Sequence, residues 1–185
     1  GTDHDRPEFV VVRRLAARYP GDPGIAVSVL LNYVTLRAGE ALFLPAGNIH
    51  AYLSGLGIEL MASSDNVLRG GLTPKHVDVA ELMTVLDFAP LPVPYLPAVP
   101  VGGAQLYAPA GAPLALAHIT GAATLRPDGP AILLSVGGTT TVTGALTSAT
   151  VRRGESWLIT GDEHVLTFAG DGDLYLAATE VASAL

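Results

Sequence analysis

Cysteine is absent from the 185-residue sequence, so disulfide scaffolds, thiolate metal sites and cysteine catalysis are excluded. Long apolar runs are absent as well, because none approaches the ~18 residues that a membrane-spanning helix requires. The opening residues, Gly1 to Arg6, contain no apolar signal region. These absences together lead us to expect a cytoplasmic protein.

Charged side chains are few, and acidic residues outnumber basic ones. Charged side chains make up 15% of the chain, with 10 basic and 17 acidic residues and a formal net charge of −7. We therefore expect neither nucleic acid nor an anionic membrane as a partner. Hydrophobic residues reach 49%, which excludes a disordered chain. The 21 glycines and 14 prolines are typical of many short strands separated by turns.

The first half of the chain mixes helix and strand signals. Residues 8–19 predict a short helix that ends at Pro20-Gly21. Asp78, followed by Glu81, resembles a capping box and predicts a second helix start. Between them, short apolar runs have the spacing of strands; these runs are residues 27–31, 34–36, 41–44 and 58–62.

The second half begins with a cluster of prolines. Five prolines fall within residues 90–100, and we expect this segment to contain no strand and to act as a semi-rigid linker. After it, apolar runs again indicate strands, at residues 131–136, 139–143, 157–160, 165–168 and 174–178.

An internal repeat relates the two halves at an offset of 115 residues. Residues 35–40 align with 150–155, and residues 55–57 align with 170–172. This spacing predicts two related β-barrel halves on either side of the prolines. The copies differ at His50 and Glu59, which align with the apolar residues Val165 and Leu174. A residue needed in only one copy is a better functional candidate than a structural one.

The segment around His50 predicts a hairpin. If Ser54-Gly55 forms a two-residue turn, His50 pairs with Glu59, and Tyr52 lies on the same face. Such a face inside a barrel could hold a metal ion or a polar ligand. The same residues would equally form an ordinary cross-strand pair on a solvated face, and the sequence leaves both interpretations open.

A polar loop at residues 63–75 follows, and it contains Arg69 and Lys75, the only lysine of the chain. Two glycines beside Arg69, Gly70 and Gly71, would let the backbone approach a ligand closely. Two cations in an acidic protein suggest an anionic small molecule. The alternative is an ion pair between Arg69 and Asp65 that only holds the loop.

Residues 29–88 contain a series of short sequence motifs in a fixed order. This series of motifs, or words, resembles the C-terminal half of type I mannose-6-phosphate isomerases (phosphomannose isomerases), which are zinc enzymes of the cupin superfamily. The words are Leu30-Leu31-Asn32, Gly39-Glu40-Ala41-Leu42-Phe43-Leu44, His50-Ala51-Tyr52, Glu59-Leu60-Met61-Ala62, Ser64-Asp65-Asn66-Val67-Leu68-Arg69 and Gly71-Leu72-Thr73-Pro74-Lys75.

The resemblance implies a mainly β fold, made of two related cupin-type (jelly-roll) β-barrel halves with a few short helices. It also implies a division of the chain into four parts. They are an N-terminal helical segment (1–24), the downstream part of the catalytic cupin barrel (25–89), a Pro-rich linker (90–104) and a second, non-catalytic cupin domain (105–185).

The family activity implied is the interconversion of mannose 6-phosphate and fructose 6-phosphate by proton transfer through a cis-enediol. His50 matches a zinc-ligating histidine of the family, and Arg69 its active-site arginine. We expect Glu59 to be a second catalytic residue, and Tyr52 and Lys75 to bind the phosphorylated hexose. The chemistry needs a base, an electrophile for the developing oxyanion and a cation for the phosphate.

The chain departs from the family in its zinc ligands. The family takes its others from an upstream Gln-x-His pair and from a Glu in a His-Lys-Pro-Glu stretch, whereas the single glutamine here, Gln105, is followed by Leu106-Tyr107. A catalytic zinc usually has three protein ligands. We therefore expect a C-terminal part of the enzyme, with an incomplete zinc site and no activity alone.

The alternative is a non-catalytic cupin module that binds a sugar or mediates association. Strand edges left exposed in either case would favour self-association.

Overall fold

The computed structural model describes residues 6–64 and 67–184. The chain divides into two compact units. The first unit comprises the chain up to residue 38 together with residues 42–57 and 63–94, and the second comprises residues 39–41, 58–62 and 95–185. No described helix is long and apolar enough to cross a membrane.

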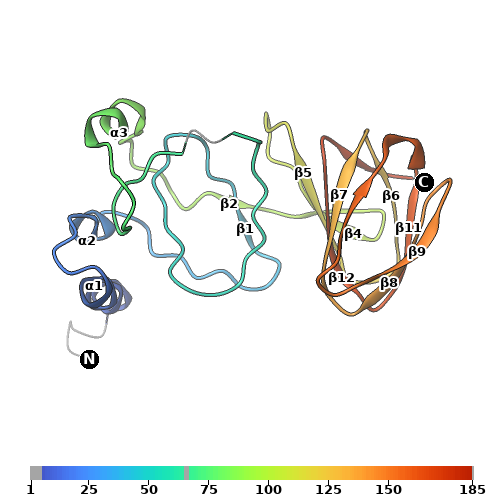
Figure 1. Cartoon of the computed structure of the whole chain (residues 1–185), viewed down its shortest axis with the longest axis horizontal. Helices are drawn as coiled ribbons and strands as arrows, with labels where there is room; N and C mark the ends of the chain where they lie inside the picture. The colour runs from blue at the N-terminus through green and yellow to red at the C-terminus, as the bar shows by residue number, and fades with distance from the viewer. Residues whose placement is uncertain (1–5, 65–66, 185) are drawn as a thin grey trace. The chain divides into compact units, whose positions relative to one another are not determined.

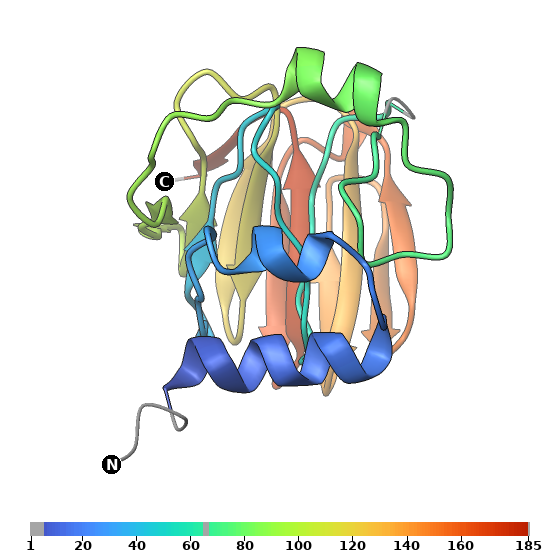
Figure 2. The same cartoon turned by 90° about the vertical axis from the view of Figure 1, so that its left-hand side faces the viewer.

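The first unit contains the helices α1 (Pro7–Arg18), α2 (Gly24–Ser28) and α3 (Val79–Val85), which are drawn as coiled ribbons in Figure 2. Proline at the first turn of α1 costs the helix no hydrogen bond, because an N–H at that position would have no partner within the helix. The Asp78 side chain caps α3 by accepting a hydrogen bond from Glu81 N at 3.0 Å. The predicted helix at residues 8–19 and the capped helix after Asp78 are both confirmed.

Most strands predicted for the first half are wrong. The run at 27–31 is not a strand: residues 24–28 are helical, and the Pro23 carbonyl accepts hydrogen bonds from both Ala26 N and Val27 N. The described residues at 34–36 and 58–62 form no strand. Of the run at 41–44, only β1 (Ala41–Leu42) is a strand, and it pairs with β2 (Tyr95–Leu96). Short apolar runs without a clear period do not distinguish helix, strand and loop.

The second unit contains two antiparallel sheets that face one another (Figure 1). The six-stranded sheet has the order β10-β7-β12-β5-β4-β3, and the five-stranded sheet has the order β13-β6-β11-β8-β9. The strands are β3 (Val99–Val101), β4 (Ala104–Tyr107), β5 (Ala115–Ile119), β6 (Ala123–Pro127), β7 (Ala131–Gly137), β8 (Thr139–Thr143), β9 (Ser148–Arg152), β10 (Ser156–Ile159), β11 (Leu166–Gly170), β12 (Asp173–Ala178) and β13 (Val181–Ser183). The five strands predicted after the prolines are confirmed as β7, β8, β10, β11 and β12.

The core of the second unit lies between its two sheets. Successive side chains of a strand point to opposite faces, so in β12 the residues Leu174 and Leu176 are fully buried while Tyr175 between them is partly exposed. Phe168 from β11 and Leu125 from β6 bury their side chains from the opposite sheet. The apolar layer between the sheets therefore sets which face of each strand carries polar side chains.

The proline segment differs from its prediction, because strands form within it. β2 lies at residues 95–96, and β3 includes Pro100, which pairs in register with Gln105 of β4. β3 is the edge of the six-stranded sheet and pairs only with β4. Proline cannot donate to a ladder and is therefore tolerated at an edge strand. The prediction that residues 90–100 contain no strand is wrong for this reason.

Truncating Phe168 should strongly destabilise the second unit. The side chain is 1% exposed between the sheets, so Phe168→Ala is expected to lower the free energy of unfolding by about 3–5 kcal/mol. Urea denaturation followed by circular dichroism measures this change. Leu158→Ala, at a residue 72% exposed on β10, is the control and should stay within about 0.5 kcal/mol of the wild type. Equal stability of the two variants would contradict the packing of Phe168 between the sheets.

Candidate functional site

The structure divides the five residues predicted for the site between the two units. His50, Tyr52, Arg69 and Lys75 belong to the first unit, and Glu59 belongs to the second. All five side chains are exposed. The geometry of the first four can therefore be described together, and that of Glu59 by itself.

His50 follows a turn that is held against the end of α3. The carbonyl of Gly47 accepts a hydrogen bond from Asp87 N at 3.0 Å. A Cβ at Gly47 would lie 2.8 Å from the Val85 carbonyl oxygen, and its φ of +81° suits glycine. Only glycine therefore allows this turn to approach α3 so closely.

The His50 ring has a defined orientation. Its Nδ1 lies 3.0 Å from the Asn48 carbonyl oxygen. Because a carbonyl oxygen can only accept, Nδ1 is the donor in this contact, which leaves Nε2 as the ring nitrogen that could face a ligand. The His50 and Tyr52 rings meet edge to face with centroids 6.1 Å apart. The two side chains therefore lie next to each other, although they do not lie on a strand.

The predicted hairpin between His50 and Glu59 does not form. The chain bends at Ser54 and Gly55, as expected, but the described residues 43–64 contain no strand and hence no ladder. The equivalent turn in the second copy, residues 170–172, explains the difference. It joins β11, which pairs with β6 and β8, to β12, which pairs with β5 and β7 in the other sheet. A turn that changes sheets does not impose a hairpin register, so the role of Glu59 depends on the family resemblance alone.

The glycines of the Arg69 loop make room for protein rather than for a ligand. A Cβ at Gly70 would overlap Ile49 Cδ1, next to His50 in the chain. A Cβ at Gly71 would lie 3.0 Å from Asp22 Oδ1 and 3.2 Å from Gly24 Cα. The Arg69 loop is thus packed between the His50 segment and the turn that precedes α2.

Sequence reasoning missed Asp22, which holds this loop in place. Its carboxylate accepts hydrogen bonds from Gly24 N at 2.7 Å and from Leu72 N at 2.9 Å. The bond to Gly24 is a local Asx turn, which the Pro-Gly-Asp-Pro-Gly run at residues 20–24 could have indicated. The bond to Leu72 spans fifty residues, and no local signal could have revealed it.

Arg69 and Lys75 both lie on the exposed side of the loop. The Lys75 backbone N–H donates to Thr73 Oγ1 at 3.2 Å, which shapes the end of the loop. Two exposed cations on one short loop favour an anion. The alternative, an ion pair between Arg69 and Asp65, involves a residue outside those that the structure describes.

Zinc does not fit the described residues as a complete site. Residues 6–64 and 67–184 contain no group of three or more histidine or acidic side chains that could hold a metal ion. A catalytic zinc needs about three protein ligands, so His50 could supply only one of them.

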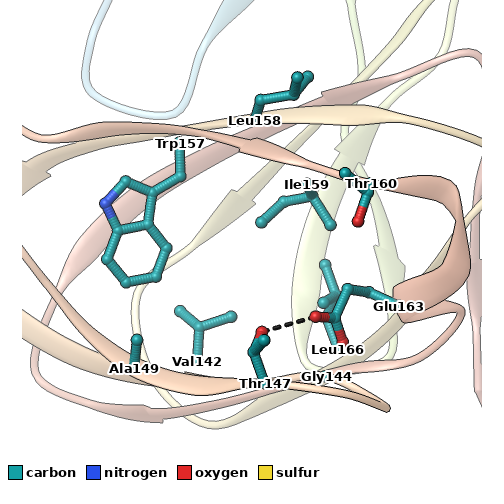
Figure 3. A pocket seen from close by; sticks show the side chains of 10 residues that line it. All are labelled: Val142, Gly144, Thr147, Ala149, Trp157, Leu158, Ile159, Thr160, Glu163 and Leu166. Carbon is teal, nitrogen blue, oxygen red and sulfur yellow. Dashed lines mark hydrogen bonds between the residues drawn. The ribbon is translucent and has the colours of Figure 1, made fainter.

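The second unit contains a cavity of about 380 Å³ between its sheets, near the ends of β8 and β10 (Figure 3). Its walls are mainly apolar and include Trp157, the only tryptophan of the chain. The full lining is Val142, Gly144, Thr147, Ala149, Trp157, Leu158, Ile159, Thr160, Glu163 and Leu166. β9 and β10 are edge strands of opposite sheets, so the cavity lies beside an unpaired seam.

Glu163, the acidic residue that lines this cavity, has a structural role. Glu163, at the end of the 3-10 helix η2 (Gly161–Glu163), is 6% exposed. Its carboxylate accepts hydrogen bonds from Leu146 N at 2.9 Å and from Thr147 Oγ1 at 2.5 Å. Both donors stabilise the charged form, so the pKa of Glu163 lies below its ordinary value. Glu163 thereby fastens the turn between β8 and β9 to η2.

A histidine that looked isolated in the sequence is paired on the outer face of the six-stranded sheet. His118 Nε2 lies 2.7 Å from Asp173 Oδ1, and the His118 ring stacks on Tyr175 at a centroid distance of 4.5 Å. Burial, together with the nearby Asp173 charge, raises the pKa of Tyr175. The antiparallel register pairs Tyr175 with His118 directly, which explains the stacking.

Mannose-6-phosphate isomerases from several organisms are similar to the chain in sequence. None of the models of known protein families matches the sequence. The mannose-6-phosphate isomerase of Escherichia coli is 38% identical over 168 residues, which is 88% of this chain and 43% of that protein. The enzyme of Rattus norvegicus is 52% identical over 79 residues, 43% of this chain and 19% of that protein. The chain thus spans less than half the length of these relatives.

Solved structures give the same result. A crystal structure of mannose 6-phosphate isomerase from Salmonella typhimurium, bound to fructose 6-phosphate and zinc, matches with a TM-score of 0.82 and 34% identity. The match covers 94% of this chain and 45% of that one. The apo form from the same organism matches with a TM-score of 0.82 and 33% identity, over 94% and 46% of the two chains.

Neutralising Glu163 should change how stability depends on pH. Its pKa is lower in the folded protein than the ordinary 4.5, so the charged form adds stability above that pH, and this contribution is lost as the pH falls through the folded pKa. We expect Glu163→Gln to be less stable than the wild type at pH 7 and the difference to shrink towards pH 3, as measured by urea unfolding. Glu180→Gln, at an exposed residue, is the control. A difference that does not depend on pH would contradict this role of the Glu163 charge.

Proposed function

The chain is related in sequence and in its cupin fold to the mannose-6-phosphate isomerases, as the sequence predicted, and on that basis we propose that it is the C-terminal part of such an enzyme. The complete enzyme would be zinc-dependent and would interconvert mannose 6-phosphate and fructose 6-phosphate through a cis-enediol. The observation that carries the proposal is the match of 94% of this chain to a relative bound to zinc and fructose 6-phosphate. A cytoplasmic location is part of the same proposal.

The proposal divides the chain as the family resemblance does. Residues 25–89 would be the downstream part of the catalytic cupin barrel, and residues 105–185 would be the second, non-catalytic cupin domain. Residues 1–24 would be a helical addition and residues 90–104 the connection between the barrels. Sheets packed face to face in the second unit support the assignment of the second domain.

Each site residue has a proposed task that suits its chemistry. Arg69 would stabilise the negative charge that develops on the enediolate oxygen, because a planar guanidinium offers two parallel donors. Lys75 would bind the phosphate as a point charge, and the exposed Tyr52 ring would contact the sugar. Glu59 would be the second catalytic residue.

The zinc ion would belong to the complete protein. His50 would supply one ligand through Nε2, since its Nδ1 is committed to the Asn48 carbonyl. The remaining ligands would come from the segment that precedes this part in the family, and residues 6–64 and 67–184 offer no group of three histidine or acidic side chains.

The first test compares this chain with the longer protein that contains it. The isolated chain should show no turnover of mannose 6-phosphate with added zinc, because one histidine cannot hold a catalytic metal ion firmly. The longer protein should turn over and should contain about one zinc ion per chain by elemental analysis. Efficient turnover by the 185-residue chain alone would overturn the proposal that it is an incomplete part.

The second test removes Arg69 from the longer protein. Arg69→Ala is expected to lower kcat by about 10²–10³-fold, the usual cost of removing one group that stabilises an oxyanion. The matched control is Arg126→Ala, which removes an exposed arginine from β6 of the second unit and should leave kcat unchanged. A normal kcat for a folded Arg69→Ala variant would remove Arg69 from the mechanism.

The alternative is a non-catalytic cupin module that binds a sugar or mediates association. One observation favours sugar binding, namely the cavity that contains Trp157 and the acidic Glu163. Association is favoured by β9 and β10, whose edges lack a neighbouring strand in their sheets. In that case self-association would use these edges.

The only tryptophan makes the alternative directly testable. If a sugar enters the cavity, Trp157 fluorescence must change in a saturable way when mannose is added. The change should be weaker for mannose 6-phosphate, because the Glu163 carboxylate repels a phosphate. We expect no saturable change with either sugar, and such a change with mannose would favour the alternative.

A further inference from the structure

We propose that Asp22 is a positioning residue for Arg69, which fixes the loop that carries Arg69 and thereby sets the rate of the isomerisation. The inference rests on the proposed function, since Asp22 acts on the reaction only through Arg69. It assigns a role in the reaction to the turn between α1 and α2, which contains none of the residues expected to contact the substrate.

The two carboxylate oxygens of Asp22 bind two separate parts of the first unit. Oδ1 accepts from Gly24 N at 2.7 Å, and Oδ2 accepts from Leu72 N at 2.9 Å. Hydrogen bonds to a charged acceptor are about twice as strong as neutral ones. Asp22 is only partly exposed, so water competes weakly for these bonds. The carboxylate therefore joins the turn before α2 to a residue three positions after Arg69.

The backbone of the loop depends on this bond. Leu72 adopts a φ of +55° and Gly71 a φ of +119°. A left-handed conformation is unfavourable for leucine, because its Cβ crowds the backbone carbonyl oxygen. The bond to Asp22 offsets that cost, since it is made only when the Leu72 N–H points towards the turn. Without the bond, Leu72 would relax to a negative φ and the preceding residues, Arg69 included, would shift.

Close packing on both sides of the Arg69 loop adds to the Asp22 bond and fixes the position of the loop. Gly71 lies against Asp22 and Gly24, where an added Cβ would come within 3.0 and 3.2 Å. Gly70 lies against Ile49, next to His50, where an added Cβ would overlap the side chain. The loop therefore cannot shift as a rigid body without losing one of these contacts. Asp22 holds it in register with the segment that carries His50.

A double-mutant cycle separates positioning from a purely structural role. If Asp22 acts through Arg69, the loss of Asp22 should slow the reaction only while Arg69 is present. If Asp22 merely stabilises the fold, its loss should slow both backgrounds by the same factor. The cycle uses the longer protein that contains this chain, with kcat and KM measured for mannose 6-phosphate.

Two substitutions of Asp22 probe the bond. Asp22→Asn keeps the size of the side chain but turns an amide NH₂ towards one of the two N–H donors. Asp22→Ser keeps one oxygen for the local turn at Gly24 and gives up the bond to Leu72. Both should lower kcat by about 10–100-fold, the cost of displacing a catalytic group by around 1 Å. In the Arg69→Ala background, each should lower kcat by less than about threefold.

Asp171 provides the matched control. Its Oδ1 accepts a hydrogen bond from Thr139 N at 3.0 Å, so within the second unit it also joins a carboxylate to a backbone N–H far along the chain. Asp171→Asn should leave kcat unchanged. Circular dichroism melting of all variants confirms that the rates compare folded proteins, and Asp22→Ser replaces Asp22→Asn if the latter does not fold.

The outcomes distinguish the inference from the function on which it rests. A normal kcat for the Asp22 variants, with a slow Arg69→Ala variant, overturns the positioning role and leaves the proposed function intact. Equal losses in both backgrounds also overturn it, because they indicate a structural role alone. A normal kcat for Arg69→Ala overturns the proposed function, and the inference fails with it.

Discussion

Burial of apolar side chains between two facing sheets is the constraint on which the second unit depends. Each strand must turn one face inwards, and the fully buried Phe168, Leu133 and Leu176 occupy the space between the sheets. The outer face is then free to carry polar pairs such as His118 with Asp173. Hydrogen bonds between strands set the register of neighbouring residues. The apolar layer between the sheets decides which side chains lie on the outer face and can contact one another there.

The first unit is held together in another way. Apart from its helices, its described residues form almost no regular ladder, and side chains bond to backbone groups far along the chain instead. Asn32 donates to the Leu91 carbonyl at 3.1 Å, and Asp22 binds Leu72. Such polar contacts are directional and few, so each determines the local backbone more strongly than one contact in an apolar core does. The residues proposed for the reaction lie in this part of the chain, apart from Glu59.

The sequence predicted those features whose signal is local. Short apolar runs between turn residues indicated β7, β8, β10, β11 and β12, and the Asp78 cap indicated α3. β5 was not predicted, because two of its three buried positions are the small residues Ala115 and Ala117, which indicate a strand only once their neighbours are known. The predicted pairing of His50 with Glu59 was wrong, because the pairing of two segments depends on contacts with other parts of the chain and not on the turn between them. The Asp22 bond to Leu72 was equally invisible, since the two residues lie fifty positions apart.

Pro100 makes the two edge strands of the six-stranded sheet differ in their ability to pair with a further strand. Because a proline nitrogen has no hydrogen to give to β4, the ring must face outwards from β3, where a further strand would need a donor. The rim at β3 therefore rejects strand addition. The opposite rim, formed by β9 and β10, has no proline in either strand. Growth of the six-stranded sheet by recruitment of another polypeptide is thus directed to its β10 edge.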